Sequence, residues 1–130
     1  MGVEPGNKSV LIVDDDPIQL EYYIAVLEFD YEIITAGSFS EALQILSSDV
    51  TVDAMTCDQH LDGGHTGTEL LDHVAICRPG LLAHTVLVSG DYFTHAGEHL
   101  APIVLKPVEP DQLLQVIGQI MTPGNLAVAC

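Results

Sequence analysis

The sequence predicts an α/β domain in which five parallel strands form a sheet with helices on both faces. Two patterns lead to this prediction. Short apolar runs rich in Val and Ile alternate with longer segments whose apolar residues recur at helical spacing. The first run, residues 10–13 (VLIV), is apolar throughout, as in a strand that is covered on both faces. Strands that alternate with helices join through right-handed crossovers, which make the sheet parallel.

The first two strands each lead into a helix. We expect these helices to span residues 17–29 and 39–48, with a second strand at 31–36 between them. A proline at the start of the first helix suits that position. Ser38 and Glu41 are spaced as a capping box, which predicts the start of the second. The residues expected on the inner faces are Leu20, Ile24, Leu27, Ala42, Leu43, Ile45 and Leu46.

The third strand is expected at residues 53–58 and ends, like the first, in a carboxylate. A polar, glycine-rich loop follows at 59–65. Thr66 and Glu69 form a second capping box, which predicts a helix over residues 67–77. A Pro-Gly pair then stops this helix.

The last two strands are expected at residues 85–89 and 103–105. Residues 90–102 between them are few and contain glycine, which predicts a short or irregular fourth helix. Pro110 begins the last helix. Its apolar stripe consists of Leu113, Leu114, Val116, Ile117 and Ile120.

The composition fits one domain with one hydrophobic core, since 48% of the 130 residues are apolar. We expect an N-terminal extension at 1–8, a domain at 9–121 and a C-terminal tail at 122–130. Nineteen acidic residues face three basic ones, a net charge of −16. Such a surface repels phosphate backbones and anionic lipids, so neither nucleic acid nor membrane is an expected direct partner.

The sequence also predicts a cytoplasmic location. No apolar run approaches the ~20 residues of a membrane span, and the first residues lack the basic and apolar pattern of a signal peptide. The three cysteines are odd in number and widely spaced, which favours reduced thiols over a disulfide framework.

Five polar side chains stand at predicted strand ends, and parallel strands bring such ends together at one edge of the sheet. They are Asp14, Asp15, Asp58, Ser89 and Lys106. Three carboxylates suit a hard cation such as Mg²⁺. An aspartate can attack phosphorus, and a hydroxyl and an ammonium can hold the phosphoryl oxygens. The pattern therefore favours phosphoryl transfer.

These motifs resemble the receiver domains of two-component response regulators. VLIVDDDP, DAMTCD, VLVSG and VLKP match, in order, that family's acidic pair, phosphoacceptor, hydroxyl and lysine-proline elements, over about residues 9–121. The resemblance implies a three-layer (βα)5, doubly wound, flavodoxin-like fold with strand order 2-1-3-4-5.

The resemblance also implies a metal site. Asp14 and Asp15 would be the metal-binding pair, and Asp58 together with the backbone carbonyl of His60 would complete the Mg²⁺ shell. Asp16, before the proline, is expected only to cap the first helix. The six histidines are not part of a combined Cys/His zinc motif, so their rings are not expected to bind metal.

The phosphoryl chemistry follows in the same way. Asp58 would accept a phosphoryl group from the phosphohistidine of a sensor histidine kinase or histidine phosphotransfer domain. Ser89 would be the switch hydroxyl and Lys106 the phosphate-binding lysine, with a cis Lys106-Pro107 bond. We expect no enzymatic activity beyond self-phosphorylation and autodephosphorylation. The receiver would act through a partner or within a larger chain, such as a hybrid histidine kinase.

Three departures from the family pattern bear on output. Ile103 occupies the position, three before the lysine, where the family usually has an aromatic switch residue. The segment before the fifth strand is at least a helical turn shorter than usual. Asp62 stands where a proline is common. The first two changes fall on the face that many regulators use for dimers, so we expect a monomer or weak dimer.

Two alternative functions stay open. One is a pseudo-receiver, an interaction module that works without phosphorylation, which Ile103 keeps under consideration. The other is a phosphatase of the haloacid dehalogenase type, which also forms an aspartyl phosphate. That family has a second aspartate two residues after the nucleophile, where this chain has His60.

Overall fold

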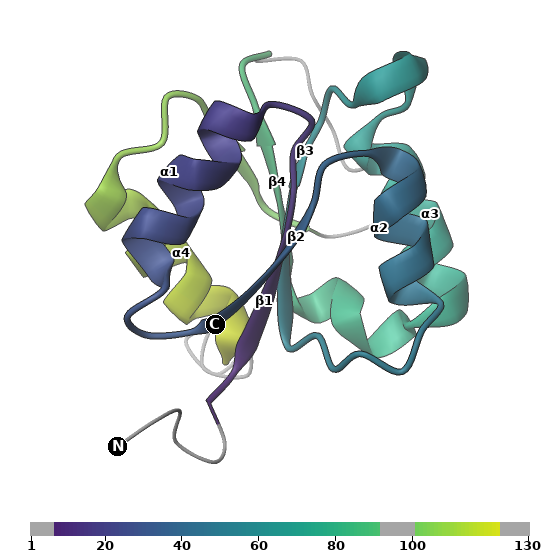
Figure 1. Cartoon of the computed structure of the whole chain (residues 1–130), viewed down its shortest axis with the longest axis horizontal. Helices are drawn as coiled ribbons and strands as arrows, with labels where there is room; N and C mark the ends of the chain where they lie inside the picture. Colours follow the sequence, from purple (N-terminus) through teal and green to yellow (C-terminus); the bar gives the residue numbers. More distant parts are fainter. Residues whose placement is uncertain (1–6, 92–100, 123–130) are drawn as a thin grey trace.

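The computed structural model describes residues 7–91 and 101–122. Its five strands form one parallel sheet in the order β2-β1-β3-β4-β5, as predicted. Helices α1 and α4 cover one face, and α2 and α3 cover the other (Figure 1). The strands are β1 (Ser9–Val13), β2 (Glu32–Ala36), β3 (Ala54–Asp58), β4 (Thr85–Ser89) and β5 (Ile103–Leu105). The helices are α1 (Pro17–Leu27), α2 (Phe39–Leu46), α3 (Gly67–Cys77) and α4 (Pro110–Met121).

The differences from the predicted elements are small. Helices α1 and α2 each end two residues earlier than expected, and two short 3₁₀ helices, Asp62–Gly64 and Pro79–His84, were not predicted. The predicted short fourth helix, between β4 and β5, involves residues 92–100, which lie outside the described residues. Helix α4 is therefore the predicted last helix.

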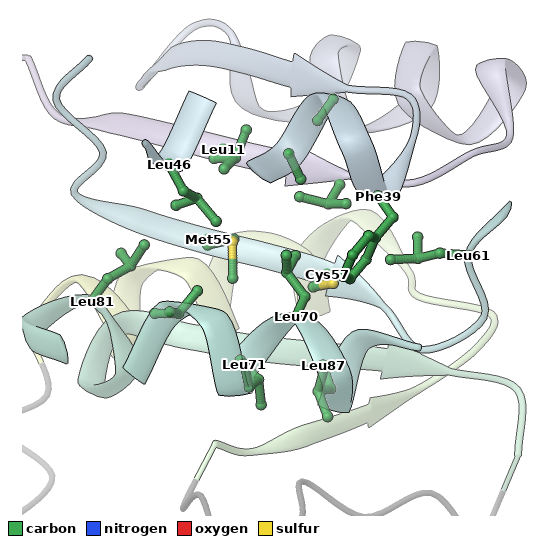
Figure 2. Packing of buried hydrophobic residues seen from close by; sticks show 14 residues of the cluster. Leu11, Phe39, Leu46, Met55, Cys57, Leu61, Leu70, Leu71, Leu81 and Leu87 are labelled. Atoms are coloured by element: carbon green, nitrogen blue, oxygen red, sulfur yellow. The ribbon is translucent and has the colours of Figure 1, made fainter. Parts of the chain in front are cut away.

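Side chains of the sheet alternate between two apolar clusters, one on each face. The cluster under α2 and α3 is drawn in Figure 2, and it includes Leu11 and Met55 of the sheet together with Leu70 and Leu71 of α3. The cluster under α1 and α4 contains Val10, Ile12, Tyr23, Leu27, Ala54, Val86, Val88, Val104, Val108, Leu113, Ile117 and Ile120. Because both faces are covered, the strands β1, β3 and β4 are buried along their whole length.

One inner-face prediction for α1 was wrong. Leu27 is fully buried as expected, but Tyr23 takes the central buried position and Ile24 is only half-buried. Tyrosine is amphipathic, so its presence in a sequence does not indicate whether it is buried or exposed. The apolar periodicity of α1 fits burial of either Tyr23 or Ile24.

Side-chain caps determine where α1, α2 and α3 begin at the carboxyl edge of the sheet. Asp16 accepts a hydrogen bond from the Ile18 backbone N–H at 2.9 Å and so starts α1, as predicted. The predicted capping box of Thr66 and Glu69 is complete. At the start of α2, Ser38 caps the helix. Each cap satisfies amide groups that would otherwise lack a partner.

Gly67 lets α3 begin directly beside the end of β3. A Cβ atom here would lie 2.7 Å from a Leu87 side-chain atom and 2.8 Å from the Asp58 carbonyl oxygen. The Gly67 N–H donates to the Gln59 carbonyl at 2.9 Å. A larger residue would therefore have to push the start of α3 away from Asp58.

Arg78, the only arginine in the sequence, joins α3 to the C-terminus of α2. Its guanidinium donates to the backbone carbonyls of Leu46 at 2.9 Å, Ile45 at 3.3 Å and Ser48 at 2.8 Å. The last carbonyls of a helix lack intrahelical partners, and a cation there also complements the helix dipole.

We predict that Arg78→Gln lowers the free energy of unfolding by about 2 kcal/mol, because three hydrogen bonds from a charged donor are lost. Lys8→Gln, at an exposed site, removes the same charge and is the control. Urea unfolding measures both. Equal effects of the two variants would mean that net charge, and not the bonds to α2, decides stability.

Candidate functional site

Three carboxylates meet at the carboxyl edge of the sheet. Asp14 and Asp15 follow β1, and Asp58 ends β3, the neighbouring strand. One ligand oxygen from each lies within 4.8 Å of the others. Asp14 is fully buried, Asp58 is nearly so, and Asp15 is exposed. The cluster thus opens to solvent on one side.

Lys106 provides the nearby positive charge. Its Nζ atom lies 3.2 Å from Oδ1 of Asp58. The residue follows β5, and its backbone N–H donates to the Ser89 carbonyl at 2.8 Å, which fixes where the side chain begins. The Lys106-Pro107 peptide bond is cis, as predicted.

Ser89 lies at the same edge, at the end of β4. Asp58 is in register with Val88, so Ser89 lies one residue beyond it on the adjacent strand. The serine side chain is fully buried, and its hydroxyl accepts a hydrogen bond from the Asp91 N–H at 3.0 Å. This bond connects the predicted switch hydroxyl to the segment after β4.

The loop after Asp58 positions His60. His60 is exposed and pairs through its backbone with Thr66 in an isolated antiparallel bridge. The neighbouring Leu61 N–H donates to the His65 carbonyl at 2.9 Å. The loop is thus closed on itself beside the three carboxylates, and the role of the His60 carbonyl as a metal ligand stays a prediction.

The burial of Asp14 has an electrostatic cost. Burial raises the pKa of this carboxyl to about 6, and the charges of Asp58 and Asp15 act in the same direction. The Asp16 N–H, which donates to Oδ1 of Asp14 at 2.9 Å, and Lys106 lower the pKa in part. Oδ2 of Asp14 is buried and has no hydrogen-bond partner within the described residues.

This donor set fits a magnesium ion. Mg²⁺ takes oxygen ligands, and one or two protein carboxylates commonly suffice because the ion keeps several waters. Here the carboxylates provide oxygens from both strands, and the buried Oδ2 of Asp14 needs a positive or hydrogen-bonding partner. Within the described residues no other group of three acidic, histidine or cysteine side chains has this geometry.

A second set of contacts, which the sequence did not reveal, ties the loop after β3 to α2. Asp62 accepts a hydrogen bond from the Phe39 N–H at 2.8 Å. The His65 ring stacks on Phe39 with centroids 4.0 Å apart, and its Nδ1 lies 3.1 Å from a Glu69 oxygen. Asp62 stands where the family commonly has a proline. This departure was the signal in the sequence that the loop makes contacts of its own.

Two residues next to the site lie on the opposite face of the sheet. Cys57 precedes Asp58 on β3, so its side chain points the other way, and it is fully buried in the α2 and α3 cluster (Figure 2). Burial raises the pKa of its thiol, and the Asp58 charge adds to this effect. Ile103 is half-buried and packs against the same cluster. Its aliphatic side chain is therefore part of the core packing next to β4.

Comparisons with known proteins agree with this geometry. A response regulator receiver domain protein (CheY-like) from Methanospirillum hungatei is 27% identical, with a TM-score of 0.82, over 94% of this chain and 99% of that one. A candidate response regulator from Chloroflexus aurantiacus is 30% identical, with a TM-score of 0.75, over 89% of this chain and 98% of that one. The chain belongs to the response regulator receiver domains. No protein-family model matches it.

A curated relative of this receiver domain is the hydrogenase transcriptional regulatory protein HoxA of Cupriavidus necator. It is 27% identical over 126 residues, which cover 91% of this chain and 25% of HoxA. The receiver thus spans about a quarter of the length of the curated relatives it matches. Within the described residues, no helix of the receiver has the length and apolar character to cross a membrane.

We predict that the metal-free receiver becomes more stable as the pH falls from about 7 to about 5. Asp14 has a pKa of about 6 when folded and an ordinary value near 3.8 when unfolded. The folded state therefore binds the proton more tightly, so this carboxyl destabilises the fold above pH 6 and the destabilisation fades as the pH falls toward 4. Thermal melts without metal measure the effect.

Asp14→Asn should be more stable than the wild type at pH 7 without metal and should lose this part of the pH dependence. Asp15→Asn, at the exposed member of the cluster, is the control and should change the metal-free melt less. Mg²⁺ and protons compete for the same carboxylates, so Mg²⁺ should bind more weakly below pH 6. An Asp14→Asn melt as pH-dependent as the wild type would contradict the assignment.

Proposed function

We propose that this receiver accepts a phosphoryl group on Asp58 in a Mg²⁺-dependent step and signals through the resulting change in conformation. The observation that carries the proposal is the contact of Lys106 Nζ with Asp58 Oδ1 at 3.2 Å, inside a cluster of three carboxylates. A lysine at this position neutralises the nucleophilic carboxylate before the reaction and can hold a phosphoryl oxygen after it.

In the proposed step, a carboxylate oxygen of Asp58 attacks phosphorus in line with the phosphorus–nitrogen bond of the partner's phosphohistidine. That bond breaks, and its electron pair stays on the imidazole nitrogen. Lys106 and Ser89 hold the phosphoryl oxygens. Mg²⁺, bound by Asp14, Asp15, Asp58 and the His60 carbonyl, would neutralise the remaining phosphoryl charge when present.

The proposed partner is a sensor histidine kinase or a histidine phosphotransfer domain, because the proposed step needs a phosphohistidine that donates the phosphoryl group. We propose self-phosphorylation and autodephosphorylation as its only chemical activities. Free thiols at Cys57 and Cys77 fit a cytoplasmic location, where thiols stay reduced. The HoxA relatives are named as transcriptional regulatory proteins, and this chain matches about a quarter of their length.

We predict that Asp58→Asn abolishes phosphate incorporation from acetyl phosphate and Mg²⁺ while the fold is retained. The amide keeps the shape of the carboxylate but is not a nucleophile. Asp62→Asn, in the following loop, is the matched control and should be phosphorylated like the wild type. Intact-protein mass spectrometry measures incorporation, and peptide mapping places it.

Phosphate found on another residue of Asp58→Asn would overturn the assignment of the phosphoacceptor. The wild type could take up no phosphoryl group from acetyl phosphate or from a phosphorylated kinase domain, and yet bind that domain whether or not the domain is phosphorylated. In that case the chain is a pseudo-receiver. If the free protein hydrolyses phosphate esters with turnover, a phosphatase function replaces the proposal.

We also predict that activation does not produce a stable dimer. Ile103 has no aromatic ring that could move between an exposed and a buried position on activation. Its aliphatic side chain already packs against the α2 and α3 cluster. Sedimentation with and without beryllofluoride should give one monomeric species in both states. A shift to dimer that Gln115→Arg on the outer face of α4 abolishes would show that the usual output face works without an aromatic residue.

A further inference from the structure

Tyr23 has a buried hydroxyl that the fold does not explain. The residue lies in the middle of α1, and only 2% of its surface is exposed. Its hydroxyl has no hydrogen-bond partner within the described residues. Burial of a hydroxyl without a partner destabilises the folded state, and a phenylalanine would fill the same apolar site without this cost. The hydroxyl therefore needs a role.

Helix geometry favours a Tyr23 hydroxyl that points toward the carboxylates. Side chains on a helix lean toward the helix N-terminus, and the N-terminus of α1 follows directly after Asp14 and Asp15. Tyr23 also belongs to the cluster on the face of the sheet where Val10 and Ile12 lie. Asp14 continues the alternation of these two residues, so it follows β1 on the same face as Tyr23.

The electrostatic environment agrees with this placement. Burial raises the pKa of the Tyr23 phenol, and the negative charges of Asp14 and Asp58 raise it further. The charge of Asp14 is the larger of the two influences. Both carboxylates are thus near enough to Tyr23 to act on its phenol.

The second buried atom without a partner is a matching acceptor. Within the described residues two buried side-chain atoms lack a hydrogen bond, and they are the Tyr23 hydroxyl and Oδ2 of Asp14. One is a donor and the other an acceptor, on the same side of β1. A buried water commonly bridges such pairs, and a carboxylate oxygen can accept more than one hydrogen bond.

We propose that Tyr23 is a positioning residue of the metal site, whose hydroxyl holds Oδ2 of Asp14 through one buried water. This inference rests on the proposed function, since it concerns the same carboxylate. The Asp16 N–H already holds Oδ1. With both oxygens held by protein groups, the plane of the carboxylate is fixed and its remaining lone pairs face the metal. Hydrogen-bond partners of metal ligands commonly orient the ligands in this way.

The neighbouring tyrosine is the matched control. Tyr22 lies one position earlier on α1, and its hydroxyl donates to the Val108 carbonyl at 2.6 Å. Tyr22→Phe therefore removes the same chemical group from the same helix, but from a bond that does not involve the carboxylates. Any effect of a missing phenol hydroxyl on α1 itself should appear in both variants.

The experiment compares Mg²⁺ affinity and metal-free stability for the wild type, Tyr23→Phe, Tyr22→Phe and Asp14→Asn. We expect Tyr23→Phe to keep its fold and to bind Mg²⁺ about 10- to 100-fold more weakly, the usual effect of losing a partner behind a metal ligand. Tyr22→Phe should bind Mg²⁺ like the wild type, and Asp14→Asn should not bind it measurably. Amide chemical shifts during Mg²⁺ titration give the affinities.

A measurement without metal tests the contact itself. In the wild type, the Tyr23 hydroxyl proton should exchange slowly with solvent, and the carboxyl carbon of Asp14 should shift in Tyr23→Phe but not in Tyr22→Phe. This readout also decides the matter if Tyr23→Phe is too unstable to titrate. A rapidly exchanging hydroxyl proton in the wild type would then overturn the proposal.

The outcomes separate the two proposals. Equal Mg²⁺ affinity for Tyr23→Phe and the wild type overturns the role of Tyr23 and leaves the metal site intact. If the wild type itself does not bind Mg²⁺, the proposed function fails and the role of Tyr23 fails with it. An equal loss of affinity in Tyr22→Phe would show that α1 packing, and not the hydroxyl, was responsible.

Discussion

The mutual repulsion of three carboxylates at one edge of the sheet is the constraint on which the rest of the structure depends. Two unit charges about 4 Å apart repel by roughly 4 kcal/mol at an effective dielectric near 20. Lys106, 3.2 Å from Asp58, offsets part of this. The pKa of Asp14 is raised mainly by burial, and the charges of Asp58 and Asp15 add to the effect. A metal-free receiver therefore holds a destabilised edge, and a bound cation would relieve it.

The surrounding fold holds this edge in place through backbone contacts. Asp16 caps α1 immediately after the acidic pair, and Gly67 lets α3 begin against the Asp58 carbonyl. Asp62 connects the loop between β3 and α3 to α2. Arg78 is used elsewhere, on the C-terminal carbonyls of α2. In a chain with so few cations, one thus stabilises a helix end while another serves the site.

The strands and their order could be predicted because burial on both faces leaves a simple pattern, and because strands that alternate with helices allow few topologies. Asp14, Asp15, Asp58 and Lys106 could be predicted as neighbours for the same reason, since parallel strands end at a common edge. Helix ends were less certain. The last turns of α1 and α2 are set by packing, which periodicity describes only approximately.

The sequence by itself determined the sheet, the acidic edge and the family, because each depends on the kind of residue at a strand end. Only the tertiary structure decided that Tyr23 and not Ile24 fills the space under α1, and that its hydroxyl is buried without a hydrogen-bond partner among the described residues. It also decided that Asp62 and His65 join the loop after β3 to Phe39. Such contacts join residues far apart in the chain, and their geometry depends on how helices pack on the sheet, which leaves no periodic trace in the sequence.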